Sequence, residues 1–309
     1  VSADNGATWK TLWEESWAKG FGGTFTEVPW PARYGHASTV YNGKLWVVGG
    51  VGSGGTLLTD VWYTTNLFTW TQATAAAPWP WREGASLVVA NGKLWYLGGD
   101  KWGERYCDVW YSTDGANWTA VSTPAGWVES PYFEAGDEFP WPVLGTGARV
   151  TVLNNVMYGT DGQSVWSSPD GVEWTLLAKE PDLWIPLPDG VVAAPFGPLH
   201  KFSFTTFDGE LVLLGGENWR LGQTTNDVWS SPDGQAWTRT APASRAHWDP
   251  RKNPATAVHN GKLFLVGGES AVSAVLGDVW QCVPGEMPVG MGALVIEATA
   301  LTEVTAQGV

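Results

Sequence analysis

The stretch Asn91–Trp118, NGKLWYLGGDKWGERYCDVWYSTDGANW, decides the fold of this chain. Asn91-Gly92 is a tight-turn dipeptide, and the apolar run Lys93–Leu97 after it ends at a pair of glycines. A second run rich in β-forming residues, Asp108–Ser112, follows, and Asp114-Gly115 then turns the chain into a third strand. The stretch therefore predicts three antiparallel strands joined by turns.

The same pattern recurs along the whole chain in three parts. The first part is a turn dipeptide, an apolar run and a Gly-Gly pair; it begins at Asn42, Asn91, Asp208 and Asn260, with a degraded copy at Asn154. The second part is a Val-Trp pair, starting at Val61, Val109, Val165, Val228 and Val279, with Asp60, Asp108, Asp227 and Asp278 before four of them. The third part is a later tryptophan, at Trp70, Trp118, Trp174 and Trp237. A recurring unit of this size predicts a repeat architecture.

The last copy of the repeat has its Val-Trp pair but lacks the later tryptophan. A matching segment lies at the other end of the chain, where Ser2–Trp9 resembles Ser231–Trp237 with one extra residue in the turn. We therefore predict a closed ring in which the N-terminal strand, residues 1–12, completes the last repeat. Closure of this kind also limits exposed sheet edges.

These residues resemble kelch-repeat β-propellers, whose blades carry a Gly-Gly pair after the second strand and a tryptophan further on. The segment Ser2–Trp9 also resembles the Asp-box turn of sialidase-type propellers, and the turns that begin at Ser112, Ser168 and Ser231 are one residue shorter. The resemblance implies an all-β propeller of four-stranded antiparallel blades. It implies no single function, because propellers carry unrelated activities. Five blades are predicted, fewer than kelch rings commonly have, and six blades are the alternative.

The predicted domain organisation follows from the repeats. The blades are expected at about 33–72, 82–121, 145–177, 200–240 and 251–282, with an insertion at 122–144 and a Pro-rich connection at 178–199. Residues 1–283 then form the propeller. Residues 284–309 are expected to be a C-terminal tail that attaches the ring to an assembly, although its loose apolar alternation also suits a strand packing on the ring or the start of another module.

Composition narrows the classes of partner. The chain has 309 residues, 44% of them hydrophobic, and a net charge of −14, which argues against binding to nucleic acid or to an anionic membrane surface. No apolar run reaches the roughly 18 residues of a membrane span. Few lysines and many Trp, Gly and Thr residues suggest an extracellular, cell-surface or virion location, and no leader peptide is visible.

Strand direction predicts which face binds a ligand. The tight turns between strands one and two and between strands three and four lie on one face. The longer loops between strands two and three and the blade-to-blade connections lie on the other, which we call the loop face. Variable loops on a rigid scaffold usually carry the binding site.

Twelve of the 23 tryptophans occupy repeat positions and are expected to pack between blades. They are Trp9, Trp46, Trp62, Trp70, Trp95, Trp110, Trp118, Trp166, Trp174, Trp229, Trp237 and Trp280. Three more, Trp30, Trp79 and Trp141, recur as Pro-Trp-Pro and suggest packing as well. Four less regular ones, Trp102, Trp127, Trp219 and Trp248, are the predicted ligand-binding tryptophans, because an exposed indole stacks on a sugar ring or anchors a protein partner.

Arg33, Arg82 and Arg251 occupy one repeat position, nine residues before the turn asparagine. At the mouth of a central channel, three guanidinium groups would clamp a carboxylate or sulfate, and the resemblance to sialidases supports that use. The alternative is that each arginine pairs with a local acid such as Glu83 or Asp249.

No catalytic constellation, metal site or cofactor site is predicted. Among the candidate acids, Glu83, Glu134, Asp137, Glu138, Glu217 and Asp249, no spacing singles out a pair, and the four histidines have no metal-ligand spacing. The favoured function is a non-enzymatic propeller that binds a glycan or protein. One alternative is an enzyme acting on an acidic sugar, sialidase-like or mutarotase-like. Another is a decoration or spacer subunit of a larger assembly.

Overall fold

The computed structural model describes residues 28–101, 104–106, 108–121, 149–181, 187–240, 248–282 and 296–297. Within these ranges the regular structure is β-strand, apart from one short 3-10 turn, η1 (Ser53–Gly55). The prediction of an all-β chain of antiparallel strands is confirmed for this part of the molecule.

Among the described residues there are eight sheets, and the five larger ones, of four or five strands each, are blades. Blade one contains β2 (Ala37–Tyr41), β3 (Lys44–Gly52), β4 (Leu57–Thr64) and β5 (Thr71–Thr74). Blade two contains β6 (Ser86–Ala90), β7 (Lys93–Leu97), β10 (Val109–Ser112) and β11 (Thr119–Ala120). Blade three contains β12 (Arg149–Leu153), β13 (Val156–Thr160), β14 (Ser164–Ser168) and β15 (Thr175–Lys179). Blade four contains β18 (Ser203–Phe207), β19 (Glu210–Leu214), β22 (Val228–Ser231) and β23 (Thr238–Thr240), and blade five β25 (Ala255–His259), β26 (Lys262–Val266), β28 (Val279–Cys282) and β29 (Ile296–Glu297).

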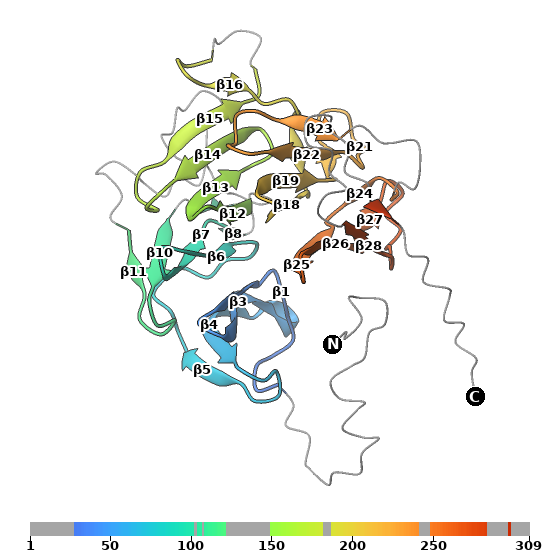
Figure 1. Ribbon diagram of the computed structural model, residues 1–309. Coiled ribbons are helices and arrows are strands. Elements are labelled where there is room, and N and C mark those ends of the chain that lie inside the picture. Colours follow the sequence, from blue (N-terminus) through green and yellow to red (C-terminus); the bar gives the residue numbers. More distant parts are fainter. Residues whose placement is uncertain are drawn as a thin grey trace, which may run out of the picture.

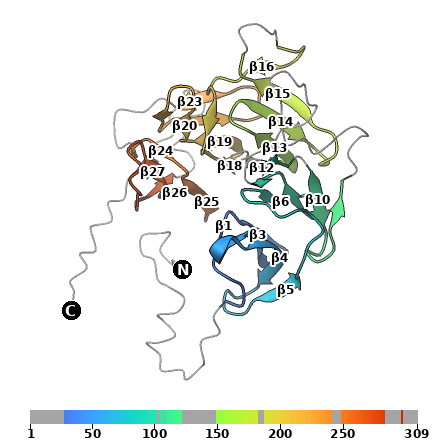
Figure 2. The same ribbon diagram turned by 180° about the vertical axis from the view of Figure 1, so that it is seen from behind.

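The five blades are arranged around a common centre (Figures 1 and 2). Their inner strands β2, β6, β12, β18 and β25 pack against one another in this order. The outer strands, such as β5, β11 and β15, lie at the periphery. Each blade therefore contacts the next one along the chain, which is the arrangement of a propeller.

The turn between the first two strands of each blade has the conformation that its dipeptide predicts. Both central residues have positive φ in all five turns, for example 51° and 67° at Asn91 and Gly92. This is the type I′ hairpin turn, which Asn-Gly and Asp-Gly favour. The degraded copy, Asn154-Asn155, adopts the same conformation with φ of 50° and 65°.

Apolar clusters lie between successive blades. Trp46 and Val48 of blade one pack with Leu94 and Tyr96 of blade two, and Leu211 of blade four packs on blade three in the same way. Trp46 and Trp95 are only 1% and 2% exposed. The prediction that these repeat tryptophans pack between blades is confirmed.

A second tier of short ribbons lies on the loop face. In blade one, β1 (Arg33–Tyr34) pairs with the end of β3, and in blade two β8 (Asp100–Lys101) pairs with β9 (Glu104–Arg105). In blade four, β20 (Glu217–Asn218) pairs with both β17 (Leu199–His200) and β21 (Gln223–Thr224). In blade five, β24 (Arg251–Lys252) pairs with β27 (Glu269–Ser270). In blades one, two, four and five, the segment after the Gly-Gly pair forms antiparallel backbone pairing with the segment that precedes the first strand of the blade.

The Gly-Gly pair is explained by this close approach. A Cβ added to Gly99 would lie 2.7 Å from the carbonyl oxygen of Glu83, and one added to Gly216 would lie 2.9 Å from that of His200. Both glycines also have positive φ, 88° and 105°. Only glycine satisfies both constraints at once.

Two features differ from the sequence prediction or lie beyond it. Blade three has a fifth strand, β16 (Val192–Ala193), parallel to β15 and inside the segment expected to be a plain connection. In blade five, Ile296–Glu297 of the predicted tail pair with the outer edge of β28. The closing strand at 1–12 and the insertion at 122–144 lie outside the described residues, so closure of the ring and its total number of blades stay predictions.

Candidate binding site on the loop face

The three repeat arginines have buried side chains and form ion pairs with aspartates of their own blades. Arg33 donates two hydrogen bonds to Asp60, at 2.7 and 2.9 Å, and Arg251 donates two to Asp278, at 2.6 and 2.7 Å. Arg82 binds Asp108 in the same two-pronged manner. The side chains of all three arginines have an exposed fraction of 0%. We call this unit the Arg-Asp staple.

The staple connects three strand ends within a blade. Besides the aspartate, each guanidinium donates to the carbonyl of the first glycine of the Gly-Gly pair, as Arg251 does to Gly267 at 2.8 Å. The aspartate in turn accepts a hydrogen bond from the indole of the Val-Trp tryptophan, as Asp60 does from Trp62 at 2.7 Å. Burial alone would raise the pKa of Asp60, but the hydrogen bonds from Arg33 and Trp62 lower it below its ordinary value.

The staple favours the structural interpretation of the three arginines. Their guanidinium groups are buried and already bound to a carboxylate, so a ligand carboxylate would have to displace Asp60, Asp108 or Asp278. The partner acids named from the sequence were wrong, because neither Glu83 nor Asp249 is the side-chain partner. Arg251 meets Asp249 only through its backbone carbonyl, at 3.1 Å.

Blade four shows what happens without the arginine. Leu199 stands at that position and is buried. Asp227, before the Val-Trp pair, instead accepts a hydrogen bond from the exposed Arg239 at 2.5 Å. The indole N–H of Trp229 is then buried without a hydrogen-bond partner. The arginine thus orients the aspartate toward its tryptophan.

The four predicted ligand-binding tryptophans have different outcomes. Trp102 and Trp127 lie outside the described residues. Trp248 is only 3% exposed and packs in the cluster between blades four and five, so it offers no surface to a ligand. It stands three residues before the staple arginine, as the packing residues Trp30 and Trp79 do. The equivalence was not predicted, because no proline precedes Trp248 as it does Trp30 and Trp79.

Trp219 is the described candidate that reaches solvent, with 48% of its surface exposed. It lies at the tip of the β20–β21 hairpin, beside Leu221, which is 67% exposed. The side-chain oxygen of Asn218 accepts hydrogen bonds from the backbone of Arg220 and Leu221, both at 3.1 Å, and so fixes the tip. Arg220 lies 5.3 Å from the Trp219 ring and pairs with Glu180 of blade three at 2.8 Å.

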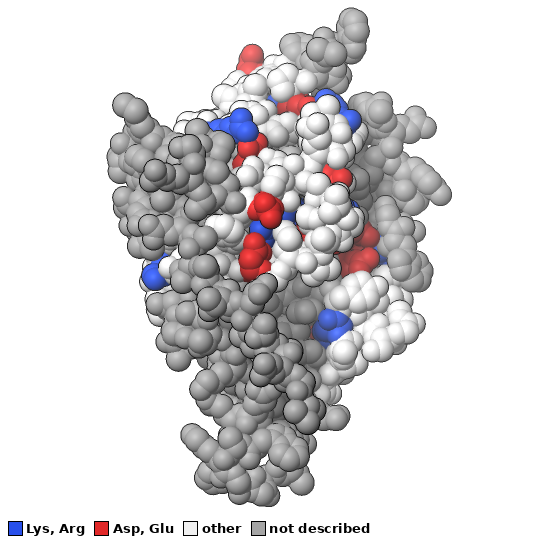
Figure 3. Space-filling view, turned by 90° about the vertical axis from the view of Figure 1, so that its right-hand side faces the viewer, with Lys and Arg blue, Asp and Glu red and all other residues white. Residues whose placement is uncertain are grey.

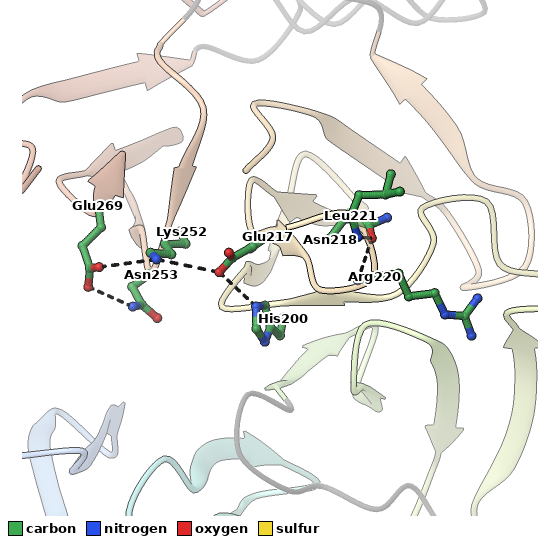
Figure 4. Close-up of polar contacts among 8 residues, drawn as sticks. All are labelled: His200, Glu217, Asn218, Arg220, Leu221, Lys252, Asn253 and Glu269. Atoms are coloured by element: carbon green, nitrogen blue, oxygen red, sulfur yellow. Dashed lines mark hydrogen bonds and ion pairs between the residues drawn. The ribbon is translucent and has the colours of Figure 1, made fainter. Parts of the chain in front are cut away.

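The base of the same hairpin joins a charged network at the loop face of blades four and five (Figure 4). The carboxylate of Glu217 lies 3.0 Å from His200 and 3.8 Å from Lys252. Lys252 also lies 3.9 Å from Glu269, which accepts a hydrogen bond from Asn253. Burial alone would raise the pKa of Glu217, but the hydrogen bond from His200 and the positive charges of Lys252, His200 and Lys201 lower it.

Two residues of this region hold an unusual backbone conformation. Lys201 and Asn253 have φ of 56° and 53°, where Gly35 and Gly84 stand at the equivalent positions of blades one and two. The backbone N–H of Asn253 donates to the carbonyl of Lys201 at 2.6 Å and links the two blades. A lysine in this conformation is disfavoured, and such residues cluster at functional sites. The backbone N–H of Gly84 donates to the carbonyl of Gly35 in the same way, at 2.9 Å, so the conformation belongs to the contact between neighbouring blades.

Charges of both signs occur together on one side of the molecule. Figure 3 shows acidic and basic side chains interspersed on the side that lies at the right of Figure 1. In blade two, burial raises the pKa of Glu83, and the nearby Asp100 adds to the effect. Of the other candidate acids, Glu217 is paired with His200, whereas Glu134, Asp137 and Glu138 lie outside the described residues.

Among the described residues, no group of three or more His, Cys, Asp or Glu side chains is placed to hold a metal ion. Likewise, no helix among these residues has both the length and the apolar character that crossing a bilayer requires.

Comparisons with known proteins agree with the architecture. The Kelch motif model matches residues 32–63, which run from the start of β1 into β4. No curated protein matches the sequence. Among solved structures, the chain is similar to "Structure of YjhT", with 16% identity, a TM-score of 0.59, and coverage of 88% of this chain and 86% of that one. Together the motif and the structural likeness support a kelch-repeat propeller fold.

Proposed function

We propose that this chain is a non-enzymatic binding propeller that recognises a glycan or protein partner through the loop face of blades four and five. A kelch-type propeller supports a binding or interaction role in general. The observation that carries the finer proposal is the β20–β21 hairpin, which presents the half-exposed Trp219 at its tip and Glu217 at its base. An indole beside amide, carboxylate and guanidinium groups suits a sugar ring with its hydroxyls, and equally a protein hot spot.

The experiment that tests the proposal is binding of the purified chain to a glycan array and to an array of purified proteins. Trp219→Ala is expected to weaken any ligand found there at least tenfold, about 1.4 kcal/mol, because the aromatic platform is lost. Phe68→Ala is the matched control, since Phe68 is 52% exposed but lies in the turn between β4 and β5, on the opposite face. Equal binding by wild type and Trp219→Ala would contradict the proposed face.

The alternative of an enzyme acting on an acidic sugar requires Arg33, Arg82 and Arg251 to bind the carboxylate of the substrate. The guanidinium groups of these arginines are already paired with aspartates. The proposal includes an extracellular, cell-surface or virion location, with attachment through residues 284–309; the few lysines and many Trp, Gly and Thr residues support that location. Immunogold labelling of the native source with an antibody against the ring tests that location.

A further inference from the structure

The loop after the Gly-Gly pair has the same backbone in blades one and five. In blade one the backbone N–H of Gly52 donates to the carbonyl of Thr56 at 2.7 Å, and in blade five that of Ser270 donates to the carbonyl of Ala274 at 2.9 Å. Each hydrogen bond closes a loop of the same length, so the residues of the two loops correspond one to one. We call residues 270–276 the blade-five tip.

The side chains of the two loops differ. Val272 of the blade-five tip stands where blade one has Gly54, and it is 85% exposed. Val275, opposite Glu269, stands where blade one has the half-buried Leu57, and it is 86% exposed. Gly54 shows that the loop needs no apolar side chain at its tip, and Val275 covers almost nothing. Packing within the blade therefore explains neither valine.

The blade-five tip lies beside the β20–β21 hairpin of blade four (Figures 1 and 2). At the base of that hairpin the backbone N–H of Gly216 donates to the carbonyl of Arg251 at 2.8 Å, and Arg251 lies opposite Ser270 in the β24–β27 pair. The hairpin itself carries Trp219 and Leu221, which are 48% and 67% exposed. Two neighbouring loops thus bring four exposed apolar side chains to one part of the loop face.

The chemistry of this surface suits a protein better than a sugar. The side chains of Val272, Val275 and Leu221 form no hydrogen bonds with hydroxyl groups, and residues 270–277 contain no charged side chain. Exposed aliphatic groups beside a tryptophan are typical of the apolar centre of a protein interface, which a polar rim surrounds. Arg220, whose side chain is 55% exposed, stands between Trp219 and Leu221 and supplies such a rim.

We propose that Trp219, Leu221, Val272 and Val275 form an apolar knob that docks in an apolar cleft of a different protein, and that basic side chains border this cleft. The inference rests on the proposed function and narrows its partner to a protein. The net charge of −14 favours a basic partner and opposes a second copy of the chain, because two such chains repel each other. The propeller then supplies the projecting part of the interface, and the partner supplies the hollow.

An array of purified proteins from the native source, probed with the full chain, tests the proposal, and surface plasmon resonance measures each hit. The double variant Val272→Thr and Val275→Thr keeps the branched shape but places hydroxyl groups in the apolar cleft, so it is expected to weaken binding about tenfold or more. Val172→Thr is the matched control, since Val172 is 40% exposed in the turn between β14 and β15, on the opposite face. Circular dichroism checks that both variants fold.

Other results would overturn the proposal. It fails if no protein on the array binds, or if the double variant binds as tightly as Val172→Thr. It also fails if the double variant loses binding to phosphatidylcholine vesicles, since the knob then meets lipid, or if it dissociates a dimer of this chain in analytical ultracentrifugation. A glycan that requires Trp219 but neither valine would uphold the proposed function and overturn this inference, whereas binding that requires none of the three would overturn both.

Discussion

At the scale of single residues, the contact between blades depends on a glycine in the turn between the third and fourth strands. Gly115 has φ of 75°, and a Cβ added there would lie 2.1 Å from a ring carbon of Trp46 in the preceding blade. Gly171 meets Trp95 in the same way, at 2.3 Å. The buried indole therefore fills the space that any side chain would need.

We predict that Gly115→Ala lowers the free energy of unfolding by about 3 kcal/mol. A left-handed conformation costs a non-glycine residue about 1–2 kcal/mol, and overpacking against Trp46 adds about 1–3 kcal/mol. Gly92→Ala is the matched control: its φ is 67° and nothing lies within 4 Å of the added Cβ. Guanidinium denaturation measures the free energy of unfolding of both variants. Equal decreases in the two would show that Trp46 moves aside without destabilising the fold.

The aspartate of the same turn makes stability depend on acid pH. The backbone N–H of Asn117, followed by its side-chain amide, lowers the pKa of Asp114 from 3.8 to about 2. A group with a lowered folded-state pKa stabilises the fold above its unfolded pKa, and the contribution disappears as pH falls from about 4 to about 2. In blade one, Asn66 makes the equivalent backbone hydrogen bonds without a titrating group.

Asp114→Asn is therefore expected to keep the turn but to remove its pH dependence. The stability difference between wild type and the variant should shrink as pH is lowered from about 4 to about 2. The reciprocal change, Asn66→Asp, should introduce the same dependence into blade one. Thermal unfolding followed by circular dichroism across this pH range measures both, and parallel pH profiles for all three proteins would argue against the assignment.

At the scale of elements, the Arg-Asp staple joins the start of a blade to its second and third strands. We predict that Arg82→Ala lowers the free energy of unfolding by about 1–3 kcal/mol, because it leaves the buried Gly98 carbonyl without its donor and the 32%-exposed Asp108 without its ion pair. Arg239→Ala removes a pair whose arginine is 52% exposed and is expected to cost less than about 1 kcal/mol. Chemical denaturation of the two variants gives the comparison, and similar values would mean that burial does not govern these pairs.

Much of the element order was predictable, because local turn chemistry specifies it. Asn-Gly dipeptides and regularly spaced Val-Trp pairs placed the hairpins, and Pro-Trp-Pro identified Trp30 and Trp79 as packing residues. The turn after β4 was missed because Leu67, with φ of 66°, stands where the other turns have glycine. The staple partners were also missed, since Asp60 is 27 residues from Arg33 and only the fold brings them together.

The candidate site was less predictable than the fold for the same reason. Trp219 is exposed because it lies at the tip of a hairpin, whereas Trp248 is buried because it lies in the segment that leads into the first strand of blade five. Composition does not distinguish these two cases. The network of His200, Glu217 and Lys252 joins residues from two blades. The sequence does contain a hint of this network, because His200 and Lys252 occupy the same repeat position, one residue after the staple position.

At the scale of the whole molecule, the first and last of the five described blades are more exposed than the blades between them. The valine of the Val-Trp pair is at most 5% exposed in blades one to four, at Val61, Val109, Val165 and Val228, whereas Val279 of blade five is only half-buried. On the inner strands, Val40 of blade one and Val258 of blade five are 66% and 48% exposed. The stability of the five blades is therefore expected to depend on the segment that covers the exposed residues of blade five.

We predict that removing residues 1–12 lowers the Tm by roughly 10 °C, whereas removing residues 291–309 leaves it nearly unchanged. The reason is the predicted completion of blade five by residues 1–12, which include Trp9: loss of a packed tryptophan costs about 3–5 kcal/mol, and each kcal/mol shifts the Tm of a domain this large by about 2–4 °C. Residues 291–309 contain no tryptophan, so their removal costs no contact of this kind. Differential scanning calorimetry of the two truncated chains and of Trp9→Ala measures the effect. A larger loss from the C-terminal truncation than from the N-terminal one would assign the outer edge of blade five to β29.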